Sequence, residues 1–511
     1  MDNMNINRES IRVKKLMNEL FAEQAIDADI TLPEYYQDIV RILKCSIYPV
    51  INSVAVAGEH VTADGVAYLK IVYAGECQNV YCYEMSYPFS KSIDINGLTD
   101  DCKVLTSTRV ESCNCRAVTS RRIDIHACVK VCFQVVRLKQ VEPVKDINGK
   151  GVQLQKKESN MLNTVNVCEK AFIVEEAVDV PENQPGVLRV LRCEGNPLVS
   201  DVKVISNKLM LKGESLVNIL YIPEDGTPEI MHARFAVPFN EILEVPGIEE
   251  NHIVDVNLLA NSVDAEIQSK GGGEGKTLGL TLRMTAQINA NEIKPITMST
   301  DSYSTDYEVN IEKSKLDTVR YFEQVEENYI CKGNLDFSDV TPEKILDVSV
   351  VSENHSANLE EQKVVLKGNL MLGVLYSTSD GNLGYREKGM NIHYEKQCPD
   401  KAKKVLFDPS LNVVAINHKY ADNNMDVKVE LMLKGSLFLL QEENVITDVN
   451  VLEDTKREKE PGGLIIYYAD KNERLWDIAR KYNISSEMLK TENKVETDVL
   501  AESCTLLIPC I

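Results

Sequence analysis

The segment GGGEGKT at residues 271–277 has the residue types that most closely resemble a nucleotide-binding loop in this sequence. A phosphate-binding loop requires the pattern G-x4-G-K-[ST] between a strand and a helix. Lys270 stands where the first Gly is required, and strand-like runs flank the segment on both sides. We therefore interpret it as a hairpin loop and expect no nucleotide or other cofactor. Because HExxH and GxSxG motifs are also missing, we predict that the protein is not an enzyme.

The fourteen cysteines could bind metal or undergo redox chemistry, and eight of them precede residue 133. Cys113 and Cys115 are one residue apart, Cys128 and Cys132 are three apart, and His126 is close by, so zinc ligation is one interpretation. The other interpretation is that Cys128 and Cys132 are small buried apolar residues, because they have the same parity in an alternating run. We favour the second and expect reduced thiols and no metal site.

Trp476 is the only tryptophan, and it follows Leu475 in a segment with helical spacing. The stripe expected to be buried is Leu475, Ile478, Ala479 and Tyr482. Trp476 is rotated about 100° from Leu475 and should be partly exposed. Trp and Arg are enriched among residues that dominate binding energy, so Trp476 with Arg474 and Arg480 is a candidate protein-binding anchor. The alternative, weighed equally, is that Trp476 covers the edge of its own domain.

A short strand is expected at residues 464–468, just before this helix. Adjacent strand residues point to opposite faces, so either Ile465 or Ile466 must face away from the core. We predict both as secondary protein-binding candidates.

Composition limits the classes of function. The chain has 511 residues, and its 56 basic and 78 acidic side chains give a net charge of −22. This charge disfavours nucleic acid and anionic membrane surfaces as partners. The N-terminus lacks the apolar segment of a secretory signal, and no apolar run is long enough to span a membrane. We expect a soluble, cytoplasmic protein without membrane insertion.

Internal repeats are the clearest sign of organisation. A shift of 148 residues superposes eight landmarks without a gap, and a further shift of 155 gives a weaker third copy. The landmark pairs are Pro33/Pro181, Glu34/Glu182, Arg41/Arg189, Leu43/Leu191, Cys45/Cys193, Pro49/Pro197, Gly65/Gly213 and Tyr73/Tyr221, and the third copy adds Gly368 and Tyr376. We interpret the repeated Gly as a turn or bulge and the repeated Tyr as a core residue.

Each copy ends in a run that alternates apolar and polar residues, which predicts half-buried strands. The fold class is therefore mainly β, with three tandem β-rich, sandwich-like modules followed by a small α+β domain of order βααβ. Polar linkers are expected at residues 142–159 and 453–463. The predicted modules are residues 28–145, 165–295 and 320–452, and the last domain is residues 464–511.

Residues 10–23 place apolar side chains at helical spacing, which predicts an amphipathic N-terminal helix within residues 1–27. Its apolar face has no partner in the same segment. We expect the helix to dock on the first module or, less favoured, on another protein.

Residues 464–511, with LWDIARKYNIS after a first strand and LLIP near the end, resemble a LysM domain. LysM domains bind N-acetylglucosamine-containing glycans in a groove between two loops. Here Asn472, Glu473 and Arg474 replace the usual Gly-Asp-Thr turn, and Ala501-Glu502 replaces the later Pro-Gly turn. Larger charged side chains in that groove argue against glycan binding. Asn472 can still adopt the left-handed backbone of the missing Gly, so the fold survives.

The three repeats resemble SPOCS modules of the DUF3794 type, through the pattern P-E, R-x-L-x-C-x-x-x-P and G-x7-Y. SPOCS repeats followed by a LysM domain are similar to a family of clostridial spore-morphogenesis proteins. The resemblance implies a protein of the mother cell, located at the forespore and spore coat surface. It also implies binding to the spore morphogenetic ATPase SpoIVA and to other spore coat proteins.

The main hypothesis is thus a non-enzymatic scaffold protein for spore coat assembly during sporulation, which binds SpoIVA through its LysM domain. The alternative is a peptidoglycan-binding or glycan-binding LysM protein. Self-association and the coat protein recognised by each module stay open at this point.

Overall fold

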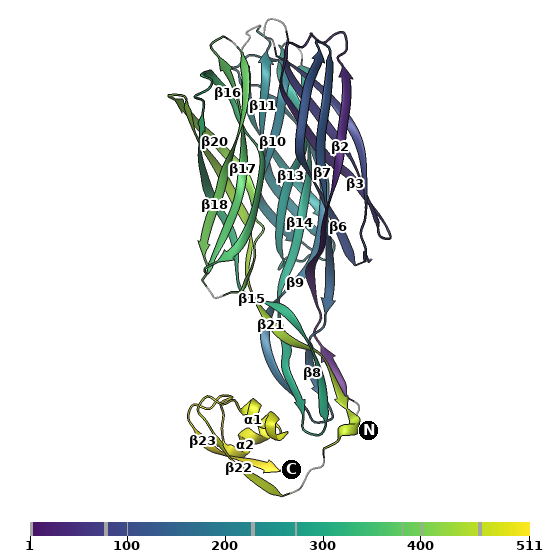
Figure 1. Cartoon of the computed structure of the whole chain (residues 1–511), viewed down its shortest axis with the longest axis vertical. Helices are drawn as coiled ribbons and strands as arrows, with labels where there is room; N and C mark the ends of the chain where they lie inside the picture. The colour runs from purple at the N-terminus through teal and green to yellow at the C-terminus, as the bar shows by residue number, and fades with distance from the viewer. Residues whose placement is uncertain are drawn as a thin grey trace.

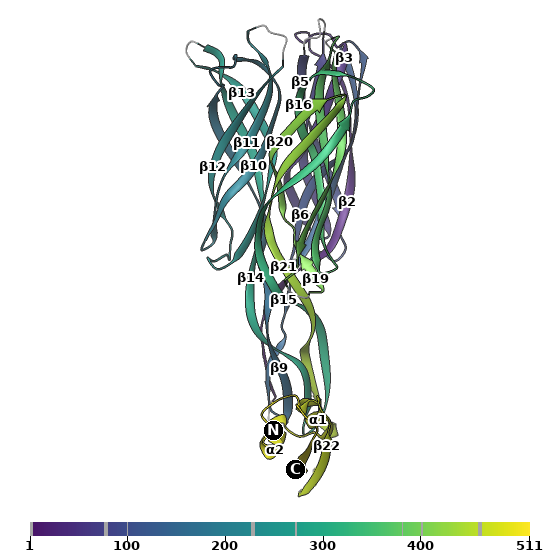
Figure 2. The same ribbon diagram turned by 90° about the vertical axis from the view of Figure 1, so that its left-hand side faces the viewer.

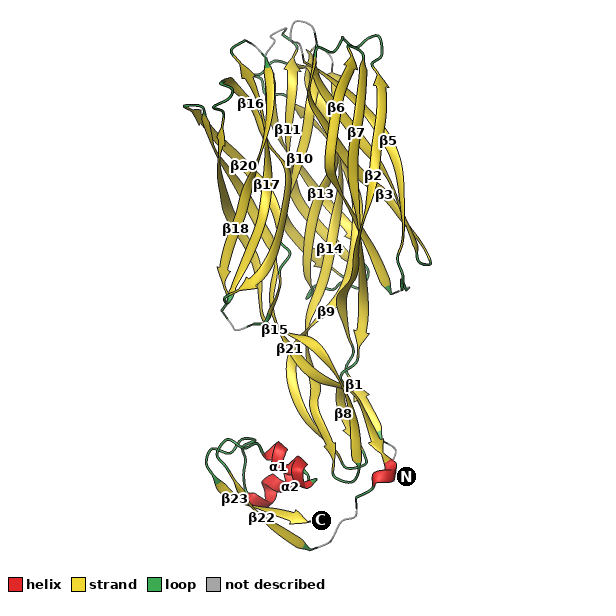
Figure 3. Cartoon of the chain, viewed as in Figure 1, coloured by secondary structure: helices red, strands yellow, loops and turns green. Residues whose placement is uncertain are grey.

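The computed structural model describes residues 4–75, 80–99, 101–225, 230–270, 273–380, 382–399, 402–457 and 462–510. The molecule is elongated, with a wide bundle of long strands at one end, a narrow stalk, and a small domain beside the stalk tip (Figure 1). Strands make up most of the described residues, and the α-helices found among these residues lie in the small C-terminal domain (Figure 3). The mainly β fold class is therefore confirmed.

Module 1 is a sandwich of two three-stranded antiparallel sheets, ordered β2-β7-β6 and β3-β4-β5. The alternating residues of β7, from Ile123 to Val135, supply much of its core. Its strands are β2 (Ile11–Thr31), β3 (Arg41–Ala57), β4 (His60–Ala74), β5 (Val80–Asp94), β6 (Cys102–Thr119) and β7 (Arg122–Val141).

The predicted N-terminal helix is wrong, because residues 11–31 form strand β2. β2 pairs with β7 along its whole length, from Ile11 opposite Val141 to Thr31 opposite Arg122. The apolar residues that suggested a helix lie largely on the surface, with Leu16 54% and Phe21 53% exposed. Long-range pairing with a buried strand overrides a local helical pattern that has no core to face.

Modules 2 and 3 repeat the same topology, with sheets β10-β11-β12 and β16-β17-β18 opposite sheets built on β14 and β21. Figure 2 shows β10–β13 as a lobe separate from β2, β3, β5 and β6. Module 2 contains β9 (Val152–Asp179), β10 (Val187–Ile205), β11 (Lys208–Pro223), β12 (Met231–Glu244), β13 (Ile253–Lys270) and β14 (Gly273–Ser304). Module 3 contains β15 (Glu308–Asp336), β16 (Pro342–Glu360), β17 (Lys363–Thr378), β18 (Leu383–Gln397), β19 (Lys404–Leu406), β20 (Ser410–Ala421) and β21 (Asn424–Leu452).

The predicted module boundaries need the same correction in each copy. Residues 28, 165 and 320 fall inside β2, β9 and β15, which are the first strands of their modules. The segment GGGEGKT is predicted to be a loop, but its residues 273–277 belong to β14, and residues 271–272 lie outside the described residues.

The repeated tyrosine is a core residue as predicted, whereas the repeated glycine lies within a strand, opposite a bulge in the neighbouring strand. A Cβ on Gly65 or Gly213 would lie 2.4 or 2.1 Å from a carbonyl oxygen of the neighbouring strand, so only glycine fits. Tyr73 and Tyr221 are fully buried, and their hydroxyls donate to the carbonyls of Gln37 (3.1 Å) and Pro185 (3.2 Å).

The three modules meet in one apolar cluster built from equivalent positions. Leu43, Leu191 and Leu346 each pack there. Each is also the unpaired residue of a β-bulge, because the register shifts at that point in β3, β10 and β16. A bulge re-aims one side chain, and here it directs a leucine of each module toward the other two.

The residue after each of these leucines carries charge. Arg192 bonds Asp347 of the next module, and its Nε lies 3.3 Å from Glu194. A cavity of about 350 Å³ borders these residues between modules 2 and 3. Since Arg192, Glu194 and Asp347 pair with one another, we interpret it as a structural junction.

The stalk contains the lower halves of β9, β14, β15 and β21 together with two short strands, β1 (Asn5–Arg8) and β8 (Val144–Asn148). Val144, Ile147, Ile446 and Val449 form its core. The predicted linker at residues 142–159 is therefore wrong, because its apolar residues pack inside the stalk.

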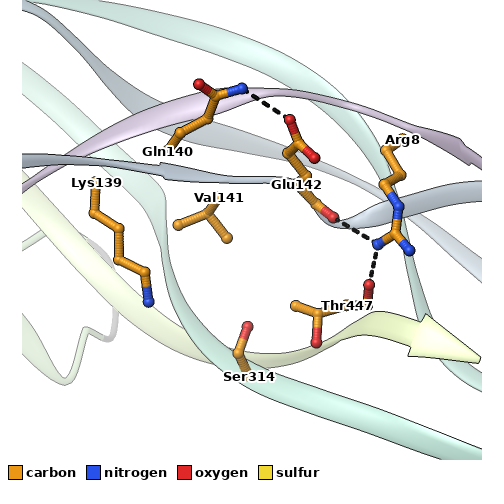
Figure 4. A pocket seen from close by; sticks show the side chains of 7 residues that line it. All are labelled: Arg8, Lys139, Gln140, Val141, Glu142, Ser314 and Thr447. Atoms are coloured by element: carbon orange, nitrogen blue, oxygen red, sulfur yellow. Dashed lines mark hydrogen bonds between the residues drawn. The ribbon is translucent and has the colours of Figure 1, made fainter.

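Arg8 fastens the N-terminal strand to the stalk. Its guanidinium donates to the carbonyls of Glu142 and Thr447 and to Asp448 Oδ1 (2.7 Å). Figure 4 shows Arg8 between Glu142 and Thr447 at the edge of an open recess of about 430 Å³. We interpret this recess as the joint between the modules and the stalk.

Candidate protein-binding surface of the C-terminal domain

The C-terminal domain has the predicted order of strand, helix, helix, strand. Its elements are β22 (Gly463–Ala469), α1 (Leu475–Tyr482), α2 (Ser486–Asn493) and β23 (Cys504–Cys510), preceded by a 3-10 turn, η2 (Glu453–Thr455). Leu475, Ile478 and Ala479 are buried in its core as predicted. Of the predicted linker, residues 458–461 lie outside the described residues.

The first loop of the domain is held by its own side chains. Asn472 has a φ of 70°, the left-handed conformation predicted for it. The carboxylate of Glu473 accepts hydrogen bonds from the Tyr467 hydroxyl and the Asp470 amide, both at 3.0 Å. The bond to Glu473 raises the pKa of Tyr467. The Glu473 carboxylate therefore stabilises this loop.

The same loop is joined to the later loop at residues 498–502 by backbone hydrogen bonds. Asn472 donates to the Leu500 carbonyl (2.9 Å), and Leu500 donates back to the Glu473 carbonyl (3.0 Å). Leu475 donates to the Asp498 carbonyl at 2.9 Å. The two loops thus form one connected unit.

The predicted partial exposure of Trp476 is wrong, because this residue packs against the stalk and is only 9% exposed. Its Nε1 donates to Oδ2 of Asp301 at 3.0 Å, and its ring meets that of Tyr303 edge to face at 4.9 Å. The Tyr303 hydroxyl donates to the Ile484 carbonyl at 2.7 Å. The helical spacing of residues predicts which side of α1 Trp476 lies on. It contains no information about whether a neighbouring part of the protein covers that side.

Arg480 joins Trp476 at Asp301, since its Nη1 donates to Oδ2 at 2.8 Å. Burial alone would raise the pKa of the Asp301 carboxyl. The hydrogen bond from Trp476 and the positive charges of Arg480 and Lys313 outweigh burial and hold that pKa below its usual value of 3.8. Burial likewise raises the pKa of Tyr303. Arg474 lies apart from this contact, where its backbone bridges to Val499.

Ile465 and Ile466 lie on opposite faces of the β22–β23 sheet. Ile466 is 57% exposed, whereas Ile465 is 38% exposed and pairs with the buried Ile508. Leu464, Ile466 and Tyr468 alternate along β22, and Leu507 lies opposite Ile466 on β23. We call these four residues the outer face. All are large, apolar and at least 40% exposed.

The five residues predicted as protein-binding therefore do not form one surface. Trp476 and Arg480 contact the stalk, Arg474 lies at the start of α1, and Ile466 belongs to the outer face. Sequence reasoning missed Leu464, Tyr468 and Leu507. The alternation in LIIYY, read strictly with a period of two, would have identified Leu464 and Tyr468.

The metal-binding interpretation of the cysteines can be compared with their positions in the structure. Cys132 is buried as predicted, but Cys128 is only half-buried, and both lie on the face of β7 opposite its core residues. Within the described ranges, no group of three or more His, Cys, Asp or Glu side chains is arranged to hold a metal ion. None of the helices in that part of the chain has the length and apolar character needed to cross a membrane.

The fold and the outer face define a modular β-sandwich protein whose small terminal domain presents an apolar surface. Two segments, residues 38–118 and 186–268, match the family model described as SipL, SPOCS domain. They cover β3–β6 of module 1 and most of β10–β13 of module 2. The match relates the chain to a family of sporulation proteins. No match is found among curated proteins or among solved structures.

Proposed function

We propose that the chain is a non-enzymatic adaptor in spore coat assembly. Its C-terminal domain, of LysM type, binds a SpoIVA-type morphogenetic ATPase, and its β modules tether other coat proteins. The observation that carries the proposal is the match of modules 1 and 2 to the SPOCS domain. The separation of the modules from the C-terminal domain by the stalk supports it, because two ends can hold two partners (Figure 1).

The outer face is the part of the C-terminal domain that we assign to the ATPase. Ile466 and Leu507 pair directly across the sheet, and Leu464 and Tyr468 flank them on β22. A contiguous apolar patch on a small domain marks a protein contact. Trp476 already packs against Tyr303 of the stalk. The outer face lies elsewhere on the domain, so a partner can bind it while the domain stays docked.

Multivalency explains how such a small surface could hold a coat. A polymerised ATPase presents many equivalent sites, and each adaptor adds one modest contact. When adaptors share coat proteins as common clients, the combined affinity exceeds that of any single contact by a large factor. The modules then need only weak individual interactions with their clients.

The test is the affinity of the full chain for immobilised SpoIVA-type ATPase. Ile466→Arg places a charge on the outer face and should weaken binding by at least about tenfold, as expected for a residue at the centre of an interface. Ile173→Arg is the matched control, because Ile173 is 56% exposed on β9, outside the C-terminal domain. Equal affinity of Ile466→Arg and the unchanged chain would refute the outer face as the site.

Two other outcomes test the proposal as a whole. If the unchanged chain does not bind the ATPase, the adaptor function is refuted. Chitooligosaccharide binding to the full chain can be measured through the fluorescence of Trp476. Saturable binding would instead favour a glycan-binding protein.

A further inference from the structure

Two edge strands of module 1 bring three cysteines together. β3 and β6 are edge strands of the two facing sheets, and the Thr108 hydroxyl on β6 donates to the Pro49 carbonyl on β3 at 2.8 Å. Farther along the same two strands, the thiol of Cys45 lies beside those of Cys113 and Cys115. All three are free thiols, half-buried against the core of the module.

The contact makes the thiols chemically different. The interaction with Cys45 lowers the pKa of Cys113, whereas the interactions with Cys113 and Cys115 raise the pKa of Cys45. The thiolate is the form of cysteine that attacks disulfides, so Cys113 is the first nucleophile of the group. Partial exposure leaves it accessible to a small reagent.

Module 2 contains an internal comparison for this cluster. The repeat shift of 148 residues places Cys193 on the position of Cys45. The bulge at Glu111 in β6 corresponds to the bulge at Asn261 in β13, so Val263 and Ala265 occupy the positions of Cys113 and Cys115. Cys193 is 7% exposed and belongs to the apolar core of module 2. These positions thus form a cluster of three thiols in module 1, whereas in module 2 they hold one cysteine, which is buried in the core.

We propose that Cys45 and Cys113 form a redox-active dithiol, with Cys115 as an alternative partner, which a small-molecule disulfide oxidises to a cross-link between β3 and β6. The Cys113 thiolate attacks one sulfur of the reagent, its S–S bond breaks, and one small thiolate leaves. Cys45 gives its proton to the departing small thiolate, and the Cys45 thiolate then attacks the Cys113 sulfur of the mixed disulfide and releases the second small thiolate, which takes a proton from solvent. Two protein thiols are oxidised, and the reagent is reduced to two thiols.

The cross-link would make the association of the two sheets of module 1 covalent and stabilise the module. It covalently joins the edges of its two sheets, which otherwise associate by packing and single hydrogen bonds such as that of Thr108. Joining residues far apart in the chain restricts the unfolded ensemble and stabilises the folded module.

The test uses the full chain, treated with glutathione disulfide under native conditions, alkylated and mapped by mass spectrometry. We expect a cross-linked peptide pair containing Cys45 with Cys113 or Cys115, two hydrogens lighter than the reduced pair, while Cys193 is alkylated. Reduction should reverse the change and lower the thermal midpoint of the protein.

Variants identify the partners. Cys113→Ser should redirect the cross-link to Cys45–Cys115, and Cys45→Ser should abolish it; Cys193→Ser should leave it unchanged. The peptide map of the unchanged chain decides the proposal even if a variant fails to fold. Complete alkylation of Cys45 after oxidation, or glutathione adducts without a cross-link, would overturn it.

Discussion

The indole nitrogen of Trp476 lies 3.0 Å from Oδ2 of Asp301, a residue 175 positions earlier in the chain. This bond, with the Arg480 bond to the same oxygen, fixes the C-terminal domain against the stalk. Tyr303 completes the contact beside it and is only 4% exposed. The single tryptophan therefore reports directly on whether the domain is docked.

Removing the stalk side of this contact should release the domain. Asp301→Ala or Tyr303→Ala should shift the Trp476 emission to longer wavelength, because the indole becomes hydrated. A lost hydrogen bond to a charged group costs about 1.5–3 kcal/mol, enough to populate the undocked state. Glu312→Ala, an exposed stalk position, is the control and should leave the spectrum unchanged. An unaltered spectrum in both test variants would contradict the docked arrangement.

Docking should also depend on pH. The docked pKa of Asp301 lies below the ordinary carboxyl value of 3.8, so docking is stabilised above that pH and loses this stabilisation as the pH falls through the docked pKa. We expect the Trp476 emission to shift in that acidic range while far-ultraviolet circular dichroism still shows folded strands. Asp301→Asn removes the titrating group, so its emission should lack this inflection. An inflection that persists in Asp301→Asn would assign the pH dependence to another group.

The charged junction between modules should be sensitive to loss of one partner. Arg192→Met leaves the carboxylate of Asp347, which is 8% exposed, without its cation and should cost about 3–5 kcal/mol. Arg283→Met breaks an ion pair with Asp264 in which both side chains are 44% exposed, and should cost less than about 1 kcal/mol. Thermal unfolding of the two variants measures the difference. Similar midpoints would show that the junction contributes little.

The repeated glycine gives a steric prediction. Gly213→Ala places a Cβ 2.1 Å from the Leu198 carbonyl oxygen, a backbone atom that cannot rotate away. We expect a destabilisation of about 1–3 kcal/mol, as for other overpacked sites, seen as a lower unfolding midpoint. Gly389→Ala is the control, because its nearest neighbour would be the Asn369 side chain at 3.2 Å. Equal midpoints would mean that the strands can separate at no cost.

The sequence predicts the modules well where residues repeat for steric reasons. Gly213 and Tyr221 mark a close approach of two strands and a buried hydroxyl, which recur in module 1 at the same spacing. The first strand of module 1 is missed because it lies on the surface for much of its length. β2 shows why: Leu16 and Phe21 are exposed, so its apolar residues do not follow the period of a buried strand.

The C-terminal domain shows the same division between local and distant information. The buried stripe of α1 and the left-handed Asn472 follow from spacing within the segment, and both are confirmed. The prediction that one of Ile465 and Ile466 faces away from the core is also confirmed, and that residue is Ile466. The burial of Trp476 depends on Asp301 and Tyr303, which no pattern within the last 48 residues could indicate.

The bulged leucines have a consequence for how the charged junction could arise. In a complex of three identical chains, every position near the point where the copies meet occurs three times with the same residue. Here the residues after the leucines are Lys44, Arg192 and Asp347, so one of the three equivalent positions has acquired the opposite charge. Fusing three copies into one polypeptide removes the constraint of identity, and each module can then recognise its own neighbour.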